Sequence, residues 1–377
     1  MGWTVLLGLY TVLVLLVQGV PLYLAFQMPH LRGPRVPTPP PSVPLVTVIV
    51  PARNEETDLR ACLDGLLHQT YPTIEILVVD GGSTDGTRAV AQARSPRVAL
   101  LEEPPLPDGW VGKNWACWNG ARRSRGEWLL FTDADVRLGP DAVWTAVEWA
   151  QRDRADLVTF ASRIEMVGAW EKIVLPFFAQ MVLTYFRTPR VNQPGSKAAM
   201  ANGQFLLVSR SAYEGTGGHQ AVHDRVLEDV ALAQRFRGAG KTLRVAWTPE
   251  LATTRMYRTP EEMYEGLLKT VSGVRFSAAR QAGFAAALVV FYWLPLALLP
   301  VGLWTGSAWV IGFGAFLWVA LFGKHAALHR ALRTSAAYGL LFPVAVGYYL
   351  VLVLVALGRG IRGRPVRWKG RSYRLTN

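Results

Sequence analysis

The chain has 377 residues, of which 51% are hydrophobic and only 18% are charged. A typical soluble domain has about 25% charged residues, so this composition excludes an ordinary soluble protein. The formal charge of +13 would suit a nucleic-acid-binding protein, but its distribution does not. All 27 acidic residues lie within residues 43–280, together with 28 of the 40 basic ones. The other basic residues flank apolar segments, which is typical of membrane topology, and we expect no nucleic-acid partner.

Membrane-spanning helices need about 20 apolar residues, and the sequence offers room for four. Three stretches contain no Asp, Glu, Lys or Arg: Gly2–His30, Gln281–Gly323 and Thr334–Gly358. The first predicts one span near Trp3–Phe26; we interpret it as a retained anchor, since a signal peptide would carry a basic start. The second is long enough for two spans, broken near residues 302–307. The third predicts another at Tyr338–Leu357.

Between the apolar segments, strand and helix patterns alternate. Strands are predicted at residues 45–50, 74–79, 98–101, 128–131, 157–160 and 205–209. Helices are predicted at residues 55–69, 86–93, 113–123, 140–151 and 230–237. This alternation indicates a doubly wound, mostly parallel α/β sheet. Cys62 and Cys117 have no metal-binding spacing, so we expect both in the core.

The predicted domain organisation has five parts. They are an N-terminal anchor (1–28), a linker with seven prolines (29–44), an α/β domain with interfacial helices (45–280), C-terminal membrane segments (281–358) and a basic tail (359–377). Within the α/β domain, residues 168–186 are apolar and aromatic but interrupted by charges and a proline. They suit either a core helix or a helix in the membrane interface, and residues 262–279 are a second candidate for the interface.

Polar motifs follow three of the predicted strands. They are Pro51-Ala52-Arg53-Asn54-Glu55-Glu56, Asp80-Gly81-Gly82-Ser83-Thr84-Asp85-Gly86-Thr87 and Thr132-Asp133-Ala134-Asp135. Each alone suits a turn or a helix cap. In open α/β sheets, however, ligands bind beyond the carboxyl ends of the strands. There, Asp133 and Asp135 could converge on a hard divalent cation whose other ligands are diphosphate oxygens. His219 and His223 have a metal-like spacing, but nearby glycines favour ordinary loop histidines.

Together with Leu227-Glu228-Asp229, these motifs resemble, in order and spacing, the family 2 inverting glycosyltransferases of GT-A fold. The resemblance covers about residues 45–250. The membrane segments, Gly109–Asn114 and Trp368–Tyr373 are similar to the lipid-directed branch, which includes ceramide glucosyltransferases and bacterial carotenoid- and hopanoid-associated enzymes.

The resemblance implies roles for individual residues. The nucleotide sugar would be bound by Pro51, Ala52, Arg53, Asn54, Glu55, Asp80, Ser83, Lys113 and Asp133. Asp133 and Asp135 would bind Mg²⁺ or Mn²⁺. Asp229 would be the general base, with its pKa raised by Glu228. Asn202, Gly203 and Gln204 would line the acceptor side.

The sequence departs from the family at two points. Gly81 stands where a second carboxylate is common, so Asp80 would make that contact alone. The Q-x-x-R-W motif of ceramide-type and processive enzymes is absent, and Ser272–Phe276 keeps only Arg275 and an aromatic residue. This argues against ceramide as acceptor and against polymer synthesis, and makes Arg275 a candidate diphosphate contact.

The function that the resemblance implies is transfer of a hexose, with UDP-glucose favoured as donor, to a hydroxyl of a carotenoid or other terpenoid lipid. Alternatives are transfer to polyprenyl phosphate, diacylglycerol or ceramide, processive polysaccharide synthesis, and a non-catalytic membrane scaffold. The retained Asp133, Asp135 and Asp229 count against the scaffold. No protein partner is evident.

A nucleotide-sugar enzyme must face the cytoplasm, so we expect a multi-pass protein of the inner membrane with the α/β domain inside. Four full spans would then put the basic tail outside, against the positive-inside rule. We therefore expect the last segment, interrupted by Pro343 and Gly347, to turn back as a re-entrant hairpin. A cysteine placed at Ser372 should then resist an impermeant thiol reagent in intact cells.

Overall fold

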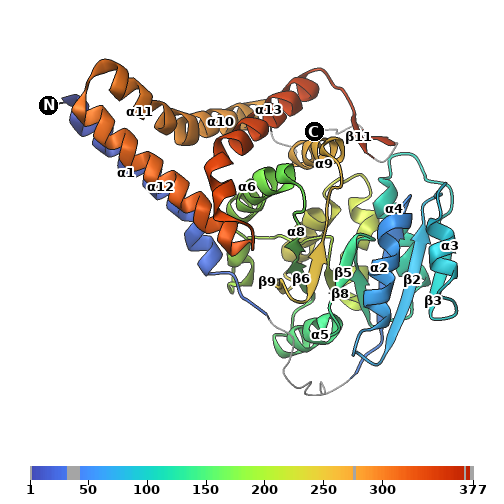
Figure 1. Ribbon diagram of the computed structural model, residues 1–377. Coiled ribbons are helices and arrows are strands. Elements are labelled where there is room, and N and C mark those ends of the chain that lie inside the picture. The colour runs from blue at the N-terminus through green and yellow to red at the C-terminus, as the bar shows by residue number, and fades with distance from the viewer. Residues whose placement is uncertain (1, 32–42, 275–276, 369–370, 374–377) are drawn as a thin grey trace. The chain divides into compact units, whose positions relative to one another are not determined.

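The computed structural model describes residues 2–31, 43–274, 277–368 and 371–373. These form two compact units (Figure 1). The sheet unit comprises Met28–Glu165 and Phe186–Met256, and the helical unit comprises Met1–Gln27, Met166–Tyr185 and Tyr257–Asn377. The segments 166–185 and 257–280, expected in the α/β domain, therefore group with the long apolar helices.

The sheet unit is built on a seven-stranded sheet with the order β3-β2-β1-β4-β8-β6-β9. These strands are β1 (Val46–Ala52), β2 (Ile74–Asp80), β3 (Val98–Glu102), β4 (Trp128–Phe131), β6 (Leu157–Ala161), β8 (Leu206–Ser209) and β9 (Leu243–Trp247). All neighbours pair in parallel except β8, which is antiparallel to both β4 and β6. The predicted α/β class with a mostly parallel sheet is confirmed.

Helices and a small second sheet complete this unit. The helices are α2 (Glu56–Leu67), α3 (Thr87–Gln92), α4 (Gly112–Arg123), α5 (Ala142–Arg152), α7 (Arg210–Gly215) and α8 (Glu228–Gly238), with 3₁₀ turns at Thr188–Asn192 and Gly218–Val222. The small sheet joins β5 (Val136–Leu138), β10 (Ala252–Thr254) and β7 (Arg163–Ile164). Leu59, Cys62 and Leu63 of α2 are fully buried against the sheet, as their helical spacing predicts.

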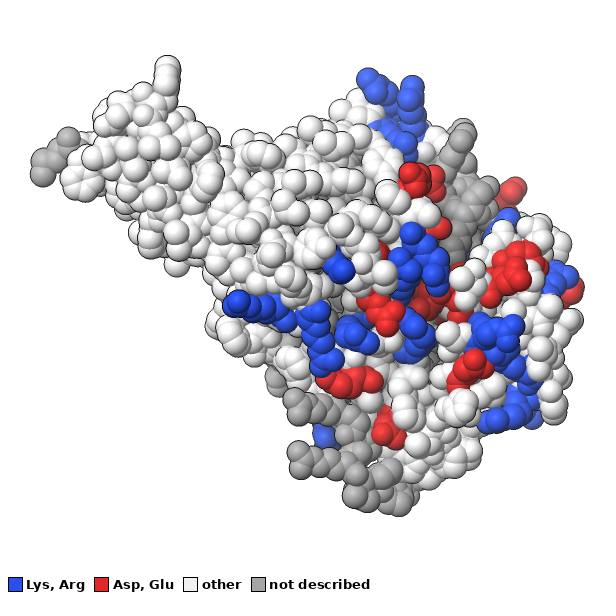
Figure 2. All heavy atoms as spheres, in the orientation of Figure 1, with Lys and Arg blue, Asp and Glu red and all other residues white. Residues whose placement is uncertain are grey.

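Among its described residues, the helical unit contains four helical segments that are long and apolar enough to cross a membrane. They span Gly2–Phe26 (α1), Ala278–Thr305 (α10, a π-helical turn and α11), Ala308–Ala331 (α12) and Ala336–Ile361 (a 3₁₀ turn and α13). Gly306, with φ of 68°, makes the turn between α11 and α12. On the face shown in Figure 2, the end of the helical unit formed by this turn and its neighbours carries no charged side chain.

The predicted re-entrant hairpin is wrong. Phe342–Ile361 is one unbroken α-helix, α13. Pro343 lies in the first turn of α13, where a backbone N–H would have no acceptor within the helix, so the proline costs no hydrogen bond. One glycine in the helix interior, Gly347, costs too little free energy to break a helix that packs well. The span before it is also longer than expected: α12 continues past Gly323, and the buried Lys324 donates to Gln18 Oε1 of α1 over 2.5 Å.

Two shorter helices belong to the same unit. They are α6 (Ala169–Tyr185) and α9 (Pro260–Gly273), the segments considered as interfacial. Both pack against α13, and α6 also packs against α1. Residues 366–368 and 371–373 pair as the antiparallel strands β11 and β12.

Candidate active site

The strands β1, β2 and β3 end level with one another, which brings their following loops together. In the parallel register, Ala52 is opposite Asp80, and Asp80 is opposite Glu102. The loops after β1 and β2 therefore start side by side at the carboxyl edge of the sheet, where ligands bind in open α/β folds.

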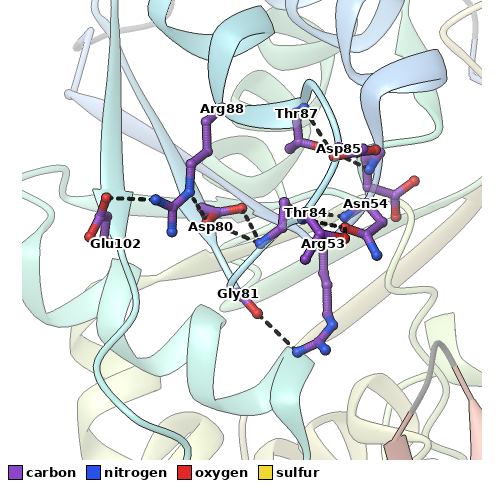
Figure 3. A network of polar contacts seen from close by, with 11 residues as sticks. Arg53, Asn54, Asp80, Gly81, Thr84, Asp85, Thr87, Arg88 and Glu102 are labelled. Atoms are coloured by element: carbon purple, nitrogen blue, oxygen red, sulfur yellow. Dashed lines mark hydrogen bonds and ion pairs between the residues drawn. The ribbon is translucent and has the colours of Figure 1, made fainter.

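Hydrogen bonds tie the loop after β1 to the loop after β2 (Figure 3). The amide N–H of Asn54 donates to Ser83 Oγ over 3.0 Å, and the amide N–H of Thr84 donates to Asn54 Oδ1 over 2.9 Å. Asn54 has a φ of 54°, in the left-handed region that asparagine tolerates better than most residues. The amide N–H of Gly86 donates to Glu56 Oε2, and the amide N–H of Glu56 donates to Asp85 Oδ2. The two motifs predicted to bind the nucleotide sugar are thus joined by hydrogen bonds into one surface.

Asp80 lies beneath this surface rather than on it. Its side chain is fully buried, and it accepts from Arg88 Nε over 2.7 Å and from the amide of Ser83. Arg88 also pairs with Glu102 over 3.1 Å. Asp80 therefore shapes the loop, and its direct contact with a nucleotide stays a prediction.

Glu103 is a residue that the sequence motifs did not indicate. A Cβ on Gly81 would lie 3.5 Å from each carboxylate oxygen of Glu103. Glu103, which follows β3, therefore places a carboxylate beside Gly81, the position of the β2 motif where a second carboxylate is common. The sequence signal that could have indicated Glu103 is its position directly after a strand. On the other side, Arg53 Nη1 donates to the carbonyl of Gly81 over 3.0 Å.

One predicted metal ligand, Asp133, and the predicted base pair, Glu228 and Asp229, surround Lys113. Its ammonium, at the start of α4, lies 2.6 Å from Asp133 Oδ1 and 2.7 Å from Glu228 Oε1. Asp229 Oδ2 accepts from the amide of Gly203 over 2.8 Å, and its Oδ1 accepts from the amide of Val230 over 2.7 Å. Four segments distant in sequence therefore meet at one charged cluster, which we call the Lys113 cluster.

Charge and burial tune this cluster. Burial and the neighbouring Glu228 raise the pKa of Asp229 to about 6, although Lys113 and the two amide N–H groups act in the opposite direction. Burial lowers the pKa of Lys113, but Asp133, Glu228 and Asp229 outweigh it and hold that pKa well above its ordinary value. At neutral pH the site therefore carries a fixed cation beside a carboxylate of raised basicity.

Asn202, Gly203 and Gln204 form a rigid turn against this cluster. The amide of Asn202 donates to Thr159 Oγ1 over 2.9 Å, and the amide of Gln204 donates to Asn202 Oδ1 over 3.1 Å. A Cβ on Gly203 would stand 2.8 Å from Lys113 Nζ and 3.1 Å from Glu228 Oε1. A Cβ at this position would therefore displace the Lys113 ammonium from its ion pairs.

A Gly203→Ala substitution should therefore lower kcat by as much as about 100-fold, because a shift of about 1 Å in a positioned group can cost that much. The Lys113 side chain can move aside, so the melting temperature should change little. Gly238→Ala is the matched control, since a Cβ there meets nothing within 4 Å. Equal activity of the two variants would contradict a role for this close approach.

The residues after β4 suit a hard cation. Asp133 and Asp135 offer carboxylate oxygens on either side of the buried Ala134. The nearby Cys62 is fully buried, and burial raises the pKa of its thiol, so no thiolate competes as a ligand. Within the described part of the chain, no group of three or more His, Cys, Asp or Glu residues is arranged to hold a metal. Two carboxylates leave most of an octahedron open, which fits Mg²⁺ or Mn²⁺ shared with a diphosphate.

Other candidate residues lie apart from this chemistry. His219 is buried in the core, where its Nδ1 and Tyr213 Oη are 2.9 Å apart and burial lowers its pKa to about 3. His223 Nδ1 instead contacts the carbonyl of Gln220. Asn114 donates to the carbonyls of Val222 and Arg225, which anchors the loop before Glu228. Arg275 lies outside the described residues.

The sheet order, with a carboxylate pair after β4 and an acidic pair at the start of α8, defines a GT-A glycosyltransferase fold. A profile of Glycosyl transferase family 2 matches residues 47–217, and this part of the chain is a domain of that family. The predicted family and fold are confirmed.

Particular relatives are informative. The 4,4'-diaponeurosporenoate glycosyltransferase of Staphylococcus aureus (strain MRSA252) is 24% identical over 338 residues, 88% of each chain. The protein of the same name from strain USA300 is 27% identical over 230 residues, 60% of each chain. Among solved structures, the mannosyltransferase PcManGT from Pyrobaculum calidifontis, in complex with GDP-Man and Mn²⁺, is similar with a TM-score of 0.54 and 21% identity, covering 93% of this chain and 98% of that one.

Proposed function

We propose that this protein is an inverting, metal-dependent glycosyltransferase that moves a hexose from a nucleotide sugar to a hydroxyl of a membrane lipid, with a carotenoid or other terpenoid as acceptor. The observation that carries the proposal is the Lys113 cluster, in which a carboxylate of raised basicity lies next to a fixed cation and an acidic metal motif. The names of the curated relatives support the acceptor class.

Asp229 is the base in this proposal. The acceptor oxygen attacks the anomeric carbon, its proton passes to an Asp229 carboxylate oxygen, and the bond from that carbon to the diphosphate breaks. A pKa of about 6 leaves Asp229 ionised at neutral pH while keeping it a better proton acceptor than an ordinary aspartate. Each of its oxygens already accepts one amide N–H and retains a second lone pair for the acceptor hydroxyl.

Lys113 and the two aspartates of the metal motif serve the leaving group. Asp133 and Asp135 would hold a divalent cation, which neutralises the charge that develops on a departing diphosphate. Lys113 is held between Asp133 and Glu228, so its ammonium is oriented before the donor arrives. The P. calidifontis structure, which holds GDP-Man and Mn²⁺, is consistent with a cation on this fold.

The acceptor group distinguishes two versions of this function. A hydroxyl must lose a proton as it attacks, so it needs a base. A carboxylate, as the relatives' name diaponeurosporenoate indicates for them, is already ionised and needs none. The raised pKa of Asp229 favours the hydroxyl.

We also propose that the sheet unit faces the cytoplasm at the inner membrane. Thiol labelling of a cysteine at an exposed position such as Asp64 measures on which side of the membrane the sheet unit lies.

The test is lipid extraction from cells with and without the gene, followed by mass spectrometry. We expect one hexosylated lipid to disappear with the gene and to return with the wild-type gene but not with an Asp229→Asn copy. Loss of a glycosyl ester instead of a glycoside would move the acceptor to the carboxylate class. An unchanged lipid profile, together with no transfer from UDP-glucose or GDP-mannose by the purified protein, would overturn the proposal.

A further inference from the structure

The helix α13 has two faces of different character. One face packs against α6, α9 and α10, and residues on it such as Val346 and Leu352 are fully buried. The opposite face carries apolar side chains at helical spacing along the length of the helix, each of them 51% to 71% exposed: Val344, Val351, Leu354 and Ile361. We call these four residues the α13 stripe. An exposed apolar face of this length indicates contact with lipid or with another protein.

The helix α9 lies beside α13 and runs in the same direction. Val344 and Tyr348, in the first two turns of α13, border one cavity together with Glu261 and Glu265, in the first half of α9. The strand β11, which begins just after α13, also contacts α9. At 1.5 Å per residue, the 14-residue α9 is about 20 Å long, so it reaches from the first turns of α13 to its C-terminal end. In Figure 1, α1 and α12 lie side by side, whereas α13 turns away from them toward α9 and β11.

The helix α10 lies along α13 in the opposite direction. It packs against α13, and a Cβ on Gly347, near the start of α13, would lie 3.3 Å from Trp293 in the π-helical turn that follows α10. Arg280, at the start of α10, is about 20 Å back along the same helical segment. The connection from α9 to α10 is therefore at the C-terminal end of α13.

The path of the chain then determines the side of the membrane on which each end of α13 lies. Among the described residues between Met256, the last of the sheet unit, and the start of α10 there is no candidate span, so this connection is on the same side as the sheet unit. The C-terminal end of α13, which lies beside it, is on that side too. Two crossings, by the segments Ala278–Thr305 and Ala308–Ala331, return the chain to the same side before α13 begins.

The charges of α9 lead to the same conclusion. Glu261, Glu262 and Glu265 are exposed on this helix. If α13 crossed the hydrocarbon core, α9 would have to enter the core beside it, where each charged side chain is costly. A helix of 14 residues is also too short to cross about 30 Å of hydrocarbon.

We propose that α13 does not cross the membrane and instead lies in the bilayer surface on the side of the sheet unit, with the α13 stripe in contact with lipid. This is how an interfacial helix binds: its apolar face reaches the acyl chains while its ends stay at the level of the head groups. Arg359, Arg362 and Arg364, at and just after the end of α13, are then placed to contact anionic phosphates.

The proposal also accounts for the basic C-terminal tail. Of the four candidate segments in the described chain, three then cross the membrane, and the residues after α13 share a side with the sheet unit. This arrangement agrees with the positive-inside rule, which a fourth crossing would violate. It concerns membrane topology only and does not depend on sugar transfer.

The first test measures the depth of the α13 stripe in reconstituted bilayers. Single cysteines replace Val344, Val351 or Ile361 in the full chain and carry a bimane fluorophore; the native Cys62 and Cys117 are fully buried. Lipids brominated near the head group should quench all three positions more strongly than lipids brominated near the chain end. Val319→Cys is the control, because Val319 is 74% exposed in the middle of α12 and should show the reverse order. A Val351 position that is quenched like Val319 would overturn the proposal, and Leu354→Cys repeats the measurement if Val351→Cys fails to fold.

The second test determines the side of the membrane in intact cells. Arg362→Cys should resist an impermeant thiol reagent before permeabilisation, as Asp64→Cys in the sheet unit does, and react afterwards. Thr305→Cys, next to the turn between α11 and α12, should show the opposite accessibility relative to Asp64→Cys. An Arg362→Cys variant that behaves like Thr305→Cys would show that α13 crosses. Stripe positions that no brominated lipid quenches, but that form disulfides between two copies of the chain, would assign the stripe to a second copy and also overturn the proposal.

Discussion

An Asp229→Asn variant should show a kcat lowered by about 10²–10⁴-fold, the usual loss when a positioned base is removed. Nucleotide affinity should stay close to that of the wild type, because the base contacts the acceptor hydroxyl and not the donor. Single-turnover kinetics with a lipid alcohol, together with calorimetric titration of UDP, measure both. Normal kcat with weakened nucleotide binding would move Asp229 to the donor site.

The pH dependence provides an independent check on the same residue. The kcat/KM of the wild type should fall as pH drops below about 6, where Asp229 becomes protonated. Because folding raises this pKa above 3.8, the ordinary value for an aspartate, the native state binds the proton more tightly than the unfolded state does. The stability contributed by the protonated group is therefore lost as pH rises from about 4 to 6. Over that range the wild type should lose stability relative to Asp229→Asn.

Asp135→Asn should abolish measurable turnover in saturating acceptor and leave the fold intact, because Asp135 lies in a loop at the edge of the sheet. EDTA should silence the wild type, and Mn²⁺ or Mg²⁺ should restore it. Asp64→Asn is the control. Asp64 is an exposed carboxylate near the C-terminal end of α2, where it pairs with Arg94. A thermal-shift measurement gives a readout besides activity. Mn²⁺ together with UDP should raise the melting temperature of the wild type but not that of Asp135→Asn. Full activity in chelator would contradict the metal assignment.

Local patterns predicted the larger elements of the sheet unit well. The β-branched run near Val46 and the helical spacing of Leu59, Cys62 and Leu63 lead to β1 and α2 within a few residues of the predicted bounds. Such elements carry their signal in consecutive residues. The strands β5, β7 and β10 were not predicted, because two or three residues are too few to show a period and they are stabilised by pairing with partners far away in sequence.

The candidate site was predicted in composition but not in contacts. The resemblance placed Lys113, Asp133, Glu228 and Asp229 in one site, and the structure brings them together. The bridging of Asp133 and Glu228 by one ammonium could not be read from the sequence, since it depends on how α4 and α8 pack. Glu103, which follows β3 outside any motif, could not be identified from the sequence for the same reason. The predicted re-entrant hairpin rested on Pro343 and Gly347 and did not take into account how α13 packs.

The division of the chain also has a consequence for how the protein can be made. The chain passes between the two units at four points, after residues 27, 165, 185 and 256. The last strand of the sheet, β9, is synthesised after α6, and Trp247 in that strand pairs with His30 near the start of the sheet unit. The sheet unit can therefore close only once an apolar helix has left the ribosome. A fragment trimmed at both ends would still carry α6 without the helices that cover it, so its aggregation in water is expected.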